Sequence, residues 1–220
     1  MITSEDEAVV AAQLGRRPRG LRAVAHRCPC GLPDVVETAP RLADGAPFPT
    51  LYYLTCPRAA AAISGLEAAG VMREMTARLA EGGQLRAAYA RAHHDYLARR
   101  DAVATADGLE PLPAGTQSAG GMPDRVKCLH ALAAHELAVP GANPLGREAL
   151  DAAGHWWSRG PCTVLSRGDD PPDPAAVSRG DNPPCPPMSA RTGPDRKDRD
   201  RIRPGHANED RSEDQAKETE

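Results

Sequence analysis

The sequence predicts an α+β protein, with a small three-stranded antiparallel sheet near the N-terminus packed with four to five helices. Three short β-type segments lie within residues 21–55, and the longer helical patterns follow them. The composition then changes near Ser158, because residues 158–220 contain ten Pro and no aromatic residue. We therefore predict one folded domain over residues 1–157, followed by a disordered Pro/Arg/Asp-rich tail over residues 158–220.

One helix and three strands are expected first. Ser4 is a suitable N-cap for a helix from Glu5 to Leu14, which Gly15 would end. The expected strands are Leu21 to Arg27, Asp34 to Thr38 and Phe48 to Thr55. Asp44-Gly45 is a typical hairpin turn between the last two strands. A meander of the three would place the ends of the first and third strands at the same edge of the sheet.

The helices after the strands are predicted from capping residues and apolar spacing. Pro57 suits the first position of a helix, and Gly70 is expected to divide that region into two helices. Residues at spacings of four, three and four define one face of a helix from Gln84 to about Val103; they are Leu85, Tyr89, Ala92 and Tyr96. The last two helices are expected over residues 124–138 and 145–157.

Charge and hydropathy exclude several classes of protein. The formal net charge of −3 argues against a surface that coats nucleic acid broadly. No run of 18 apolar residues exists, so we expect no membrane span. The first seven residues are acidic and do not form a secretory signal. We therefore expect a cytoplasmic protein, in a compartment that keeps thiols reduced.

Clustered cysteines in such a compartment favour metal binding over disulfides. Two of the six, Cys162 and Cys185, fall in the expected tail, where we predict no rigid structure. The other four match the number that closes a tetrahedral zinc site or an iron–sulfur cluster; they are Cys28, Cys30, Cys56 and Cys128. The first three follow the strand ends that a meander brings together, and Cys128 would come from the second turn of the helix over 124–138.

Other interpretations of this region stay open. Zinc and an iron–sulfur cluster are not distinguished by the sequence, and four small buried hydrophobic thiols are the alternative to either. His130 or His135 could replace one thiol. On a helix, however, His130 lies about 200° round from Cys128, and His135 lies roughly 10 Å along the axis from it. A further group on the long helix, His93-His94-Asp95, is interpreted as a partly solvated helix face.

A second candidate site is the Gly-rich segment 115–127, which runs into the expected start of a helix. Such a loop can hold phosphate or a carboxylate, here with Gly120, Gly121, Arg125 and Lys127 as the binding residues. The segment lacks the Walker and dinucleotide-binding patterns, and Asp124 would repel an anion. An ordinary flexible loop is the alternative interpretation.

Four stretches carry a resemblance to a known family. They are residues 26–38 (HRCPCGLPDVVET), 48–57 (FPTLYYLTCP), 66–75 (LEAAGVMREM) and 115–130 (GTQSAGGMPDRVKCLH). Over roughly residues 8–155 the chain resembles the actinobacterial family catalogued as domain of unknown function 501. The four candidate cysteines lie inside these stretches. The resemblance implies no particular reaction.

Three functional hypotheses follow. The first is a protein that binds a metal ion or an iron–sulfur cluster through the four cysteines, in a structural or redox-sensing role. The second is an enzyme that binds a phosphorylated or otherwise anionic small molecule at the 115–127 loop. The third is an adaptor whose helices or tail bind another protein.

Overall fold

The computed structural model describes residues 2–163 and has the predicted α+β architecture. The order of elements is α1 (Ser4–Leu14), β1 (Leu21–Arg27), β2 (Pro33–Thr38), β3 (Tyr52–Leu54), α2 (Pro57–Ala68), α3 (Val71–Ala80), α4 (Gly83–Ala106), α5 (Leu129–Ala138), α6 (Pro144–Ala153) and the 3-10 helix η1 (Trp156–Arg159). Residues 164–220 of the expected tail lie outside the described residues.

The three strands form the expected antiparallel meander in the order β1-β2-β3. The third strand is shorter than predicted. Pro47 and Pro49 flank Phe48 and have no backbone N–H to donate, so regular pairing starts only at Tyr52. Cys28 directly follows β1 and Cys56 comes two residues after the end of β3, so both lie at the same end of the sheet, as predicted.

Helix α1 begins one residue earlier than predicted because Thr3, and not Ser4, is its N-cap. The Thr3 hydroxyl accepts the Asp6 N–H, and the Asp6 carboxylate accepts the Thr3 N–H, which is a capping box. Asp6 also forms a two-pronged ion pair with Arg27, at 2.8 Å for both bonds. The Arg27 guanidinium lowers the pKa of the Asp6 carboxyl. This pair ties α1 to the end of β1.

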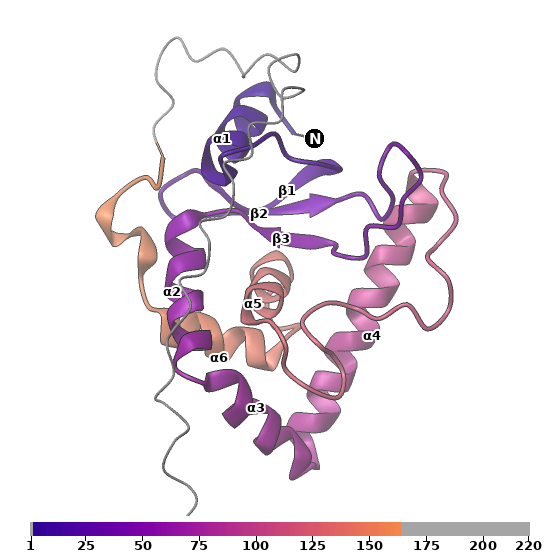
Figure 1. The fold of residues 1–220 in the computed structure, drawn as a ribbon, viewed down its shortest axis with the longest axis vertical. Helices are drawn as coiled ribbons and strands as arrows, with labels where there is room; N and C mark the ends of the chain where they lie inside the picture. Colours follow the sequence, from indigo (N-terminus) through magenta and orange to yellow (C-terminus); the bar gives the residue numbers. More distant parts are fainter. Residues whose placement is uncertain (1, 164–220) are drawn as a thin grey trace, which may run out of the picture. The chain divides into compact units, whose positions relative to one another are not determined.

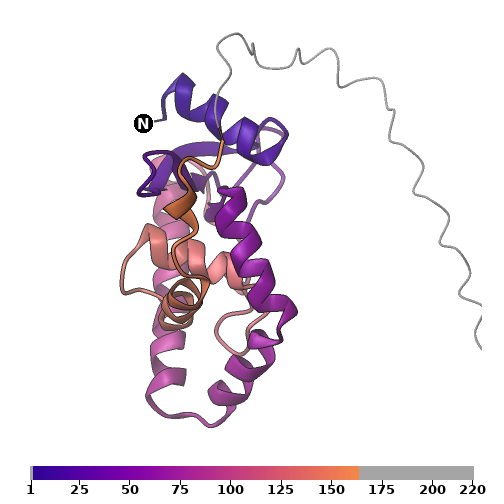
Figure 2. The same cartoon turned by 90° about the vertical axis from the view of Figure 1, so that its left-hand side faces the viewer.

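The main core is built around α5. Figure 1 shows α5 at the centre of the described chain, with α2 on one side and α4 on the other. Leu129, Leu132 and Ala133 on this helix are fully buried. The Tyr96 hydroxyl on α4 accepts the Leu51 N–H at 2.6 Å, which fixes the segment leading into β3. Figure 2 shows α3 and α4 joined at the end remote from the sheet.

The packing of α6 on α5 depends on a glycine. A Cβ atom at Gly146 would lie 2.2 Å from the Leu132 carbonyl oxygen. Real side chains never approach a carbonyl so closely, so only glycine allows this separation of the two helices. The Asn143 side chain caps α6 by accepting the Gly146 N–H at 2.9 Å.

Helix α5 begins later than predicted. The sequence predicts a helix from residue 124, but residues 121–124 form turns and α5 begins at Leu129. Backbone hydrogen bonds from Lys127 to Gly120 and from Arg125 to Gly121 close these turns. Cys128 has an extended backbone (φ −155°, ψ 111°) and is the N-cap residue, so it does not lie in the second turn of the helix.

The folded part continues past the expected boundary at Ser158. The Arg58 guanidinium donates to the Gly160 carbonyl at 2.6 Å, and the Gln13 amide donates to the Cys162 sulfur at 3.2 Å. Trp156 and Cys162 pack against the main core. The expectation that Cys162 is not held in place is therefore wrong. Within residues 2–163, no helix has the length and apolar character needed to cross a bilayer.

Candidate metal centre

Three side chains with ligand chemistry meet where α2 ends and α5 begins. The Cys128 sulfur, the His130 Nδ1 atom and a Glu67 carboxylate oxygen all lie within 4.8 Å of one another. His130 Nδ1 is 3.2 Å from Glu67 Oε1 and 3.9 Å from Cys128 Sγ. The expectation that Cys128 and His130 face apart is therefore wrong. It assumed helical geometry for both, whereas the backbone of Cys128 is extended.

Hydrogen bonds fix the protonation of the His130 ring. Its Nε2 atom lies 3.1 Å from the Ala60 carbonyl oxygen and 3.2 Å from the Ser64 hydroxyl. A carbonyl can only accept, so Nε2 carries a proton. In the neutral ring, Nδ1 then holds a lone pair that faces Glu67 Oε1, another acceptor. Such a contact needs a proton or a cation between the two atoms.

Glu67 and Cys128 are partly buried. Glu67 Oε1 also accepts the Leu129 N–H at 2.7 Å, which anchors the first turn of α5 on α2. Burial raises the pKa of the Cys128 thiol, and the Glu67 carboxylate adds to the effect. Backbone N–H groups of Ala131 and His130 act in the opposite direction, as expected at a helix N-terminus.

Cys28 and Cys30 lie in the turn between β1 and β2. The Cys28 N–H donates to Leu32, and its carbonyl accepts the Gly31 N–H. Gly31 has φ 91°, so a glycine is favoured at this turn. Burial raises the pKa of the Cys28 thiol to about 12, and the neighbouring Cys30 and Asp34 contribute.

Cys56 is the N-cap residue of α2 and is 1% exposed. Burial raises the pKa of its thiol to about 11, and the nearby Cys162 thiol adds to the shift. In the part of the chain that the structure describes, no three of the four candidate cysteine sulfurs lie within 4.8 Å of one another. The site of four thiolates thus stays a prediction.

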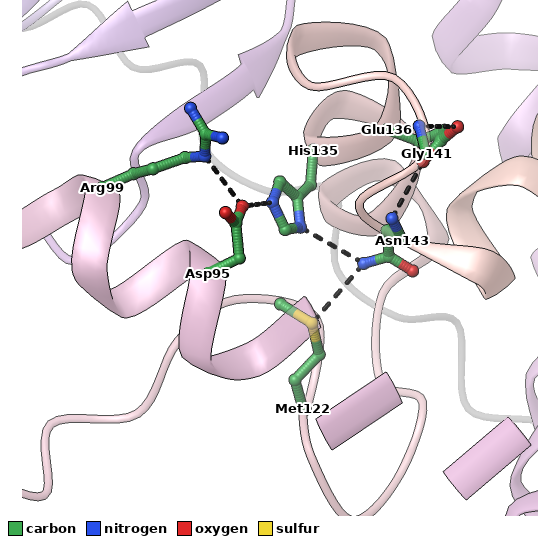
Figure 3. A network of polar contacts seen from close by, with 7 residues as sticks. All are labelled: Asp95, Arg99, Met122, His135, Glu136, Gly141 and Asn143. Atoms are coloured by element: carbon green, nitrogen blue, oxygen red, sulfur yellow. Dashed lines mark hydrogen bonds and ion pairs between the residues drawn. The ribbon is translucent and has the colours of Figure 1, made fainter. Parts of the chain in front are cut away.

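His135 lies in a separate network inside the core (Figure 3). Its Nε2 atom is 3.1 Å from Asp95 Oδ2, and its Nδ1 atom is 3.4 Å from the Asn143 amide nitrogen. Asn143 uses its oxygen to cap α6, so its NH₂ group is the donor to Nδ1. His135 is therefore neutral, with a proton on Nε2 donated to Asp95. Both ring nitrogens are engaged, and His135 is not part of the Glu67–Cys128–His130 group.

The charges of this network are set by burial and by Arg99. Burial lowers the pKa of His135, although Asp95 acts in the opposite direction. Burial would raise the pKa of Asp95, but the Arg99 guanidinium, 2.8 Å away, and His135 together lower it. The buried Glu136 carboxylate accepts the N–H groups of Gly141 and Asn143, which holds the loop between α5 and α6.

The 115–127 segment borders a cavity of about 420 Å³ against α4. Of the four residues predicted to bind an anion, Gly121 and Arg125 line this cavity, whereas Gly120 and Lys127 are not among its lining residues. A Cβ atom at Gly120 would lie 2.5 Å from the Leu132 side chain. Gly120 is thus required for packing of the loop on α5.

Several residues of these sites are not found by sequence reasoning. Glu67 lies on α2 in the family-like stretch 66–75, which has no metal-ligand motif, and it is 61 residues from Cys128. The sequence pattern assigns Asp95 to a partly solvated helix face, because its partner His135 lies on another helix. Asn143 is not identified either, although Asn followed by Pro is a typical start of a helix and is a signal that could have found its capping role.

The fold and these sites define a small α+β domain with a candidate metal-ligand group at a helix junction. Residues 24–151 match the family model described as Protein of unknown function (DUF501), and the chain therefore belongs to that family. No match was found among curated proteins or among solved structures.

Proposed function

We propose that this protein binds a transition-metal ion, Zn²⁺ by its ligand preference, through Glu67, Cys128 and His130. The observation that carries the proposal is the grouping of the Cys128 thiol, His130 Nδ1 and Glu67 Oε1 within 4.8 Å, with His130 Nδ1 and Glu67 Oε1 at 3.2 Å, a contact that is an ion pair when the ring is protonated and otherwise needs a cation. Zinc accepts sulfur, nitrogen and oxygen ligands together. A cation between the two acceptors would satisfy both.

The surrounding hydrogen bonds support this assignment. Histidine ligands usually donate their second ring N–H to a carbonyl or carboxylate, as His130 does to Ala60. Backbone N–H groups at the N-terminus of α5 partly offset the burial that raises the pKa of the Cys128 thiol, and a bound cation would favour the thiolate further. Three protein ligands leave a fourth position for water. The ion would join α2 to α5, so its first effect would be on stability.

The second candidate is zinc or an iron–sulfur cluster on the four cysteines predicted from the sequence. What favours it is the position of two buried thiols, Cys28 and Cys56, at the same end of the sheet. The two candidates share Cys128 and differ at Cys56, which provides a matched pair of variants.

The test is the metal and sulfide content of the full chain purified without oxygen, with Cys128→Ser and Cys56→Ser as the compared variants. We expect about one zinc per chain in the wild type and in Cys56→Ser, and none in Cys128→Ser or His130→Ala. Metal retained by Cys128→Ser would contradict the proposal. Loss of metal in Cys56→Ser, or iron with acid-labile sulfide, would favour the four-cysteine site instead. A wild type without bound metal that also takes up no added Zn²⁺ would exclude both.

Cobalt provides an independent readout of the ligands. Co²⁺ replaces Zn²⁺ in such sites, and a thiolate ligand gives it an intense charge-transfer band. We expect that band in the wild type and in Cys56→Ser, and its absence in Cys128→Ser. A band that survives in Cys128→Ser would show that another thiol is the ligand.

A further inference from the structure

The cavity between α4 and residues 115–125 has the features of a ligand site. Its volume of about 420 Å³ is within the usual range for small-molecule pockets. Leu97, Met122 and Pro123 form an apolar wall, while His93, Asp124 and Arg125 provide polar groups. None of these residues belongs to the candidate metal group.

A buried cation organises the loop that forms one wall. Arg100 on α4 is 2% exposed, and its guanidinium donates to the carbonyl oxygens of Gln117 at 2.9 Å and Thr116 at 3.3 Å. Its contact with a carboxylate is longer, at 4.0 Å to Asp101. The positive charge of Arg100 is therefore held beneath the loop mainly by carbonyl groups.

This arrangement turns peptide N–H groups away from Arg100. In a trans peptide the C=O and N–H bonds point in opposite directions. Since the carbonyls of Thr116 and Gln117 face Arg100, the N–H groups of Gln117 and Ser118 face the other way. Neither donates a hydrogen bond to any residue from 2 to 163. Gln117 lines the cavity, whereas Ser118 is not among its lining residues, so the Gln117 N–H is the free peptide donor for an anion at this wall.

Two side chains at the cavity can complete such a site. Arg125 lines the cavity and forms no ion pair within the described residues, so its guanidinium is available. The His93 ring lies 2.8 Å through Nδ1 from the Ser118 hydroxyl, which leaves Nε2 for a ligand. The Asp124 carboxylate disfavours an anion next to it and instead suits hydroxyl groups.

We propose that this cavity binds a small organic phosphate that also carries hydroxyl groups. The phosphate is held by Arg125, by the Gln117 N–H and by the Nε2 atom of His93, and the hydroxyls face Asp124. A single phosphate ion would leave most of the cavity empty, and the apolar wall suits the carbon skeleton of an organic ligand. Inorganic phosphate carries the same charged group and is therefore the alternative ligand.

The test is titration calorimetry of the full chain with glycerol 3-phosphate, inorganic phosphate and glycerol. We expect glycerol 3-phosphate to bind, glycerol not to bind, and inorganic phosphate to bind more weakly than the ester. Arg125→Gln should weaken binding by about tenfold or more, because a charge-assisted bond is lost. Lys127→Gln is the matched control, since it removes a cation from the same segment but not from the cavity wall, and should change affinity by less than about twofold.

Four results would overturn the proposal. They are no binding of any phosphate probe at millimolar concentration, equal effects of Arg125→Gln and Lys127→Gln, equal affinity for inorganic phosphate and the ester, and loss of binding in Cys128→Ser. The last result would place the phosphate on the metal instead of in the cavity. Failure of the metal proposal leaves this one intact, because the two rest on different residues.

Discussion

Asp95 Oδ2 and His135 Nε2 are 3.1 Å apart, and this hydrogen bond joins α4 to α5 at a histidine that is fully buried. Asp95→Ala would leave the buried Nε2–H without a partner. We expect a loss of about 1–3 kcal/mol in the free energy of unfolding. Urea unfolding followed by tryptophan fluorescence measures it.

The control is Asp151→Ala. Asp151 forms an exposed ion pair with Arg147 on α6, which is worth less than about 1 kcal/mol. If the two variants unfold at the same urea concentration, the Asp95–His135 bond does not stabilise the fold.

Acid should weaken the fold in a range that begins near pH 6.5. Burial lowers the pKa of both His135 and His93 below their ordinary value of 6.5. Below that pH the unfolded chain takes up protons that the native histidines do not. Stability therefore falls as the pH falls, by up to about 1.4 kcal/mol per pH unit for each group. Asp95 has a lowered pKa, so its contribution is lost only at much lower pH.

The measurement is the urea midpoint at a series of pH values. His135→Gln and His93→Gln should each reduce the slope below pH 6.5, and the double variant should reduce it most. A wild type whose stability is unchanged between neutral pH and pH 5 would contradict the neutral state assigned to His135.

The separation of α5 and α6 should be sensitive to one methyl group. Gly146→Ala places a Cβ atom against the Leu132 carbonyl and should cost about 1–3 kcal/mol through overpacking. Gly65→Ala is the matched control, because nothing lies within 4 Å of a Cβ atom at that position of α2. It should stabilise the protein by about 0.5–1 kcal/mol through helix propensity. Thermal unfolding of the two variants should thus shift in opposite directions; a shift in the same direction would contradict the close contact.

The sequence predicts those parts of the fold that depend on neighbouring residues. The meander, the division of α2 from α3 at Gly70 and the buried face of α4 follow from turn residues and spacing. The start of α5 does not, because Glu67 sets it from another helix by accepting the Leu129 N–H. Because Cys128 is expected to lie within the helix, its side chain is expected to point away from that of His130. The extended backbone of Cys128 instead brings the two side chains together. The burial of Arg100 could not be predicted from the sequence either, because its hydrogen-bond partners are backbone carbonyls of a separate loop.

Zinc should stabilise the folded chain through Glu67, Cys128 and His130. A ligand that binds only the native state at 100 times its Kd adds about 2.7 kcal/mol. For a domain of this size, each kcal/mol raises Tm by about 2–4 °C. Added Zn²⁺ should therefore raise the Tm of the chelator-treated wild type and of Cys56→Ser, but not that of Cys128→Ser. Glu67→Gln should reduce the shift without abolishing it, because a neutral amide oxygen is a weaker ligand than a carboxylate.

Differential scanning calorimetry measures these Tm shifts, with Mg²⁺ as the control ion, since Mg²⁺ prefers oxygen ligands over sulfur and nitrogen. Equal shifts with Mg²⁺ and Zn²⁺, or an undiminished Zn²⁺ shift in Cys128→Ser, would place any metal effect elsewhere in the chain.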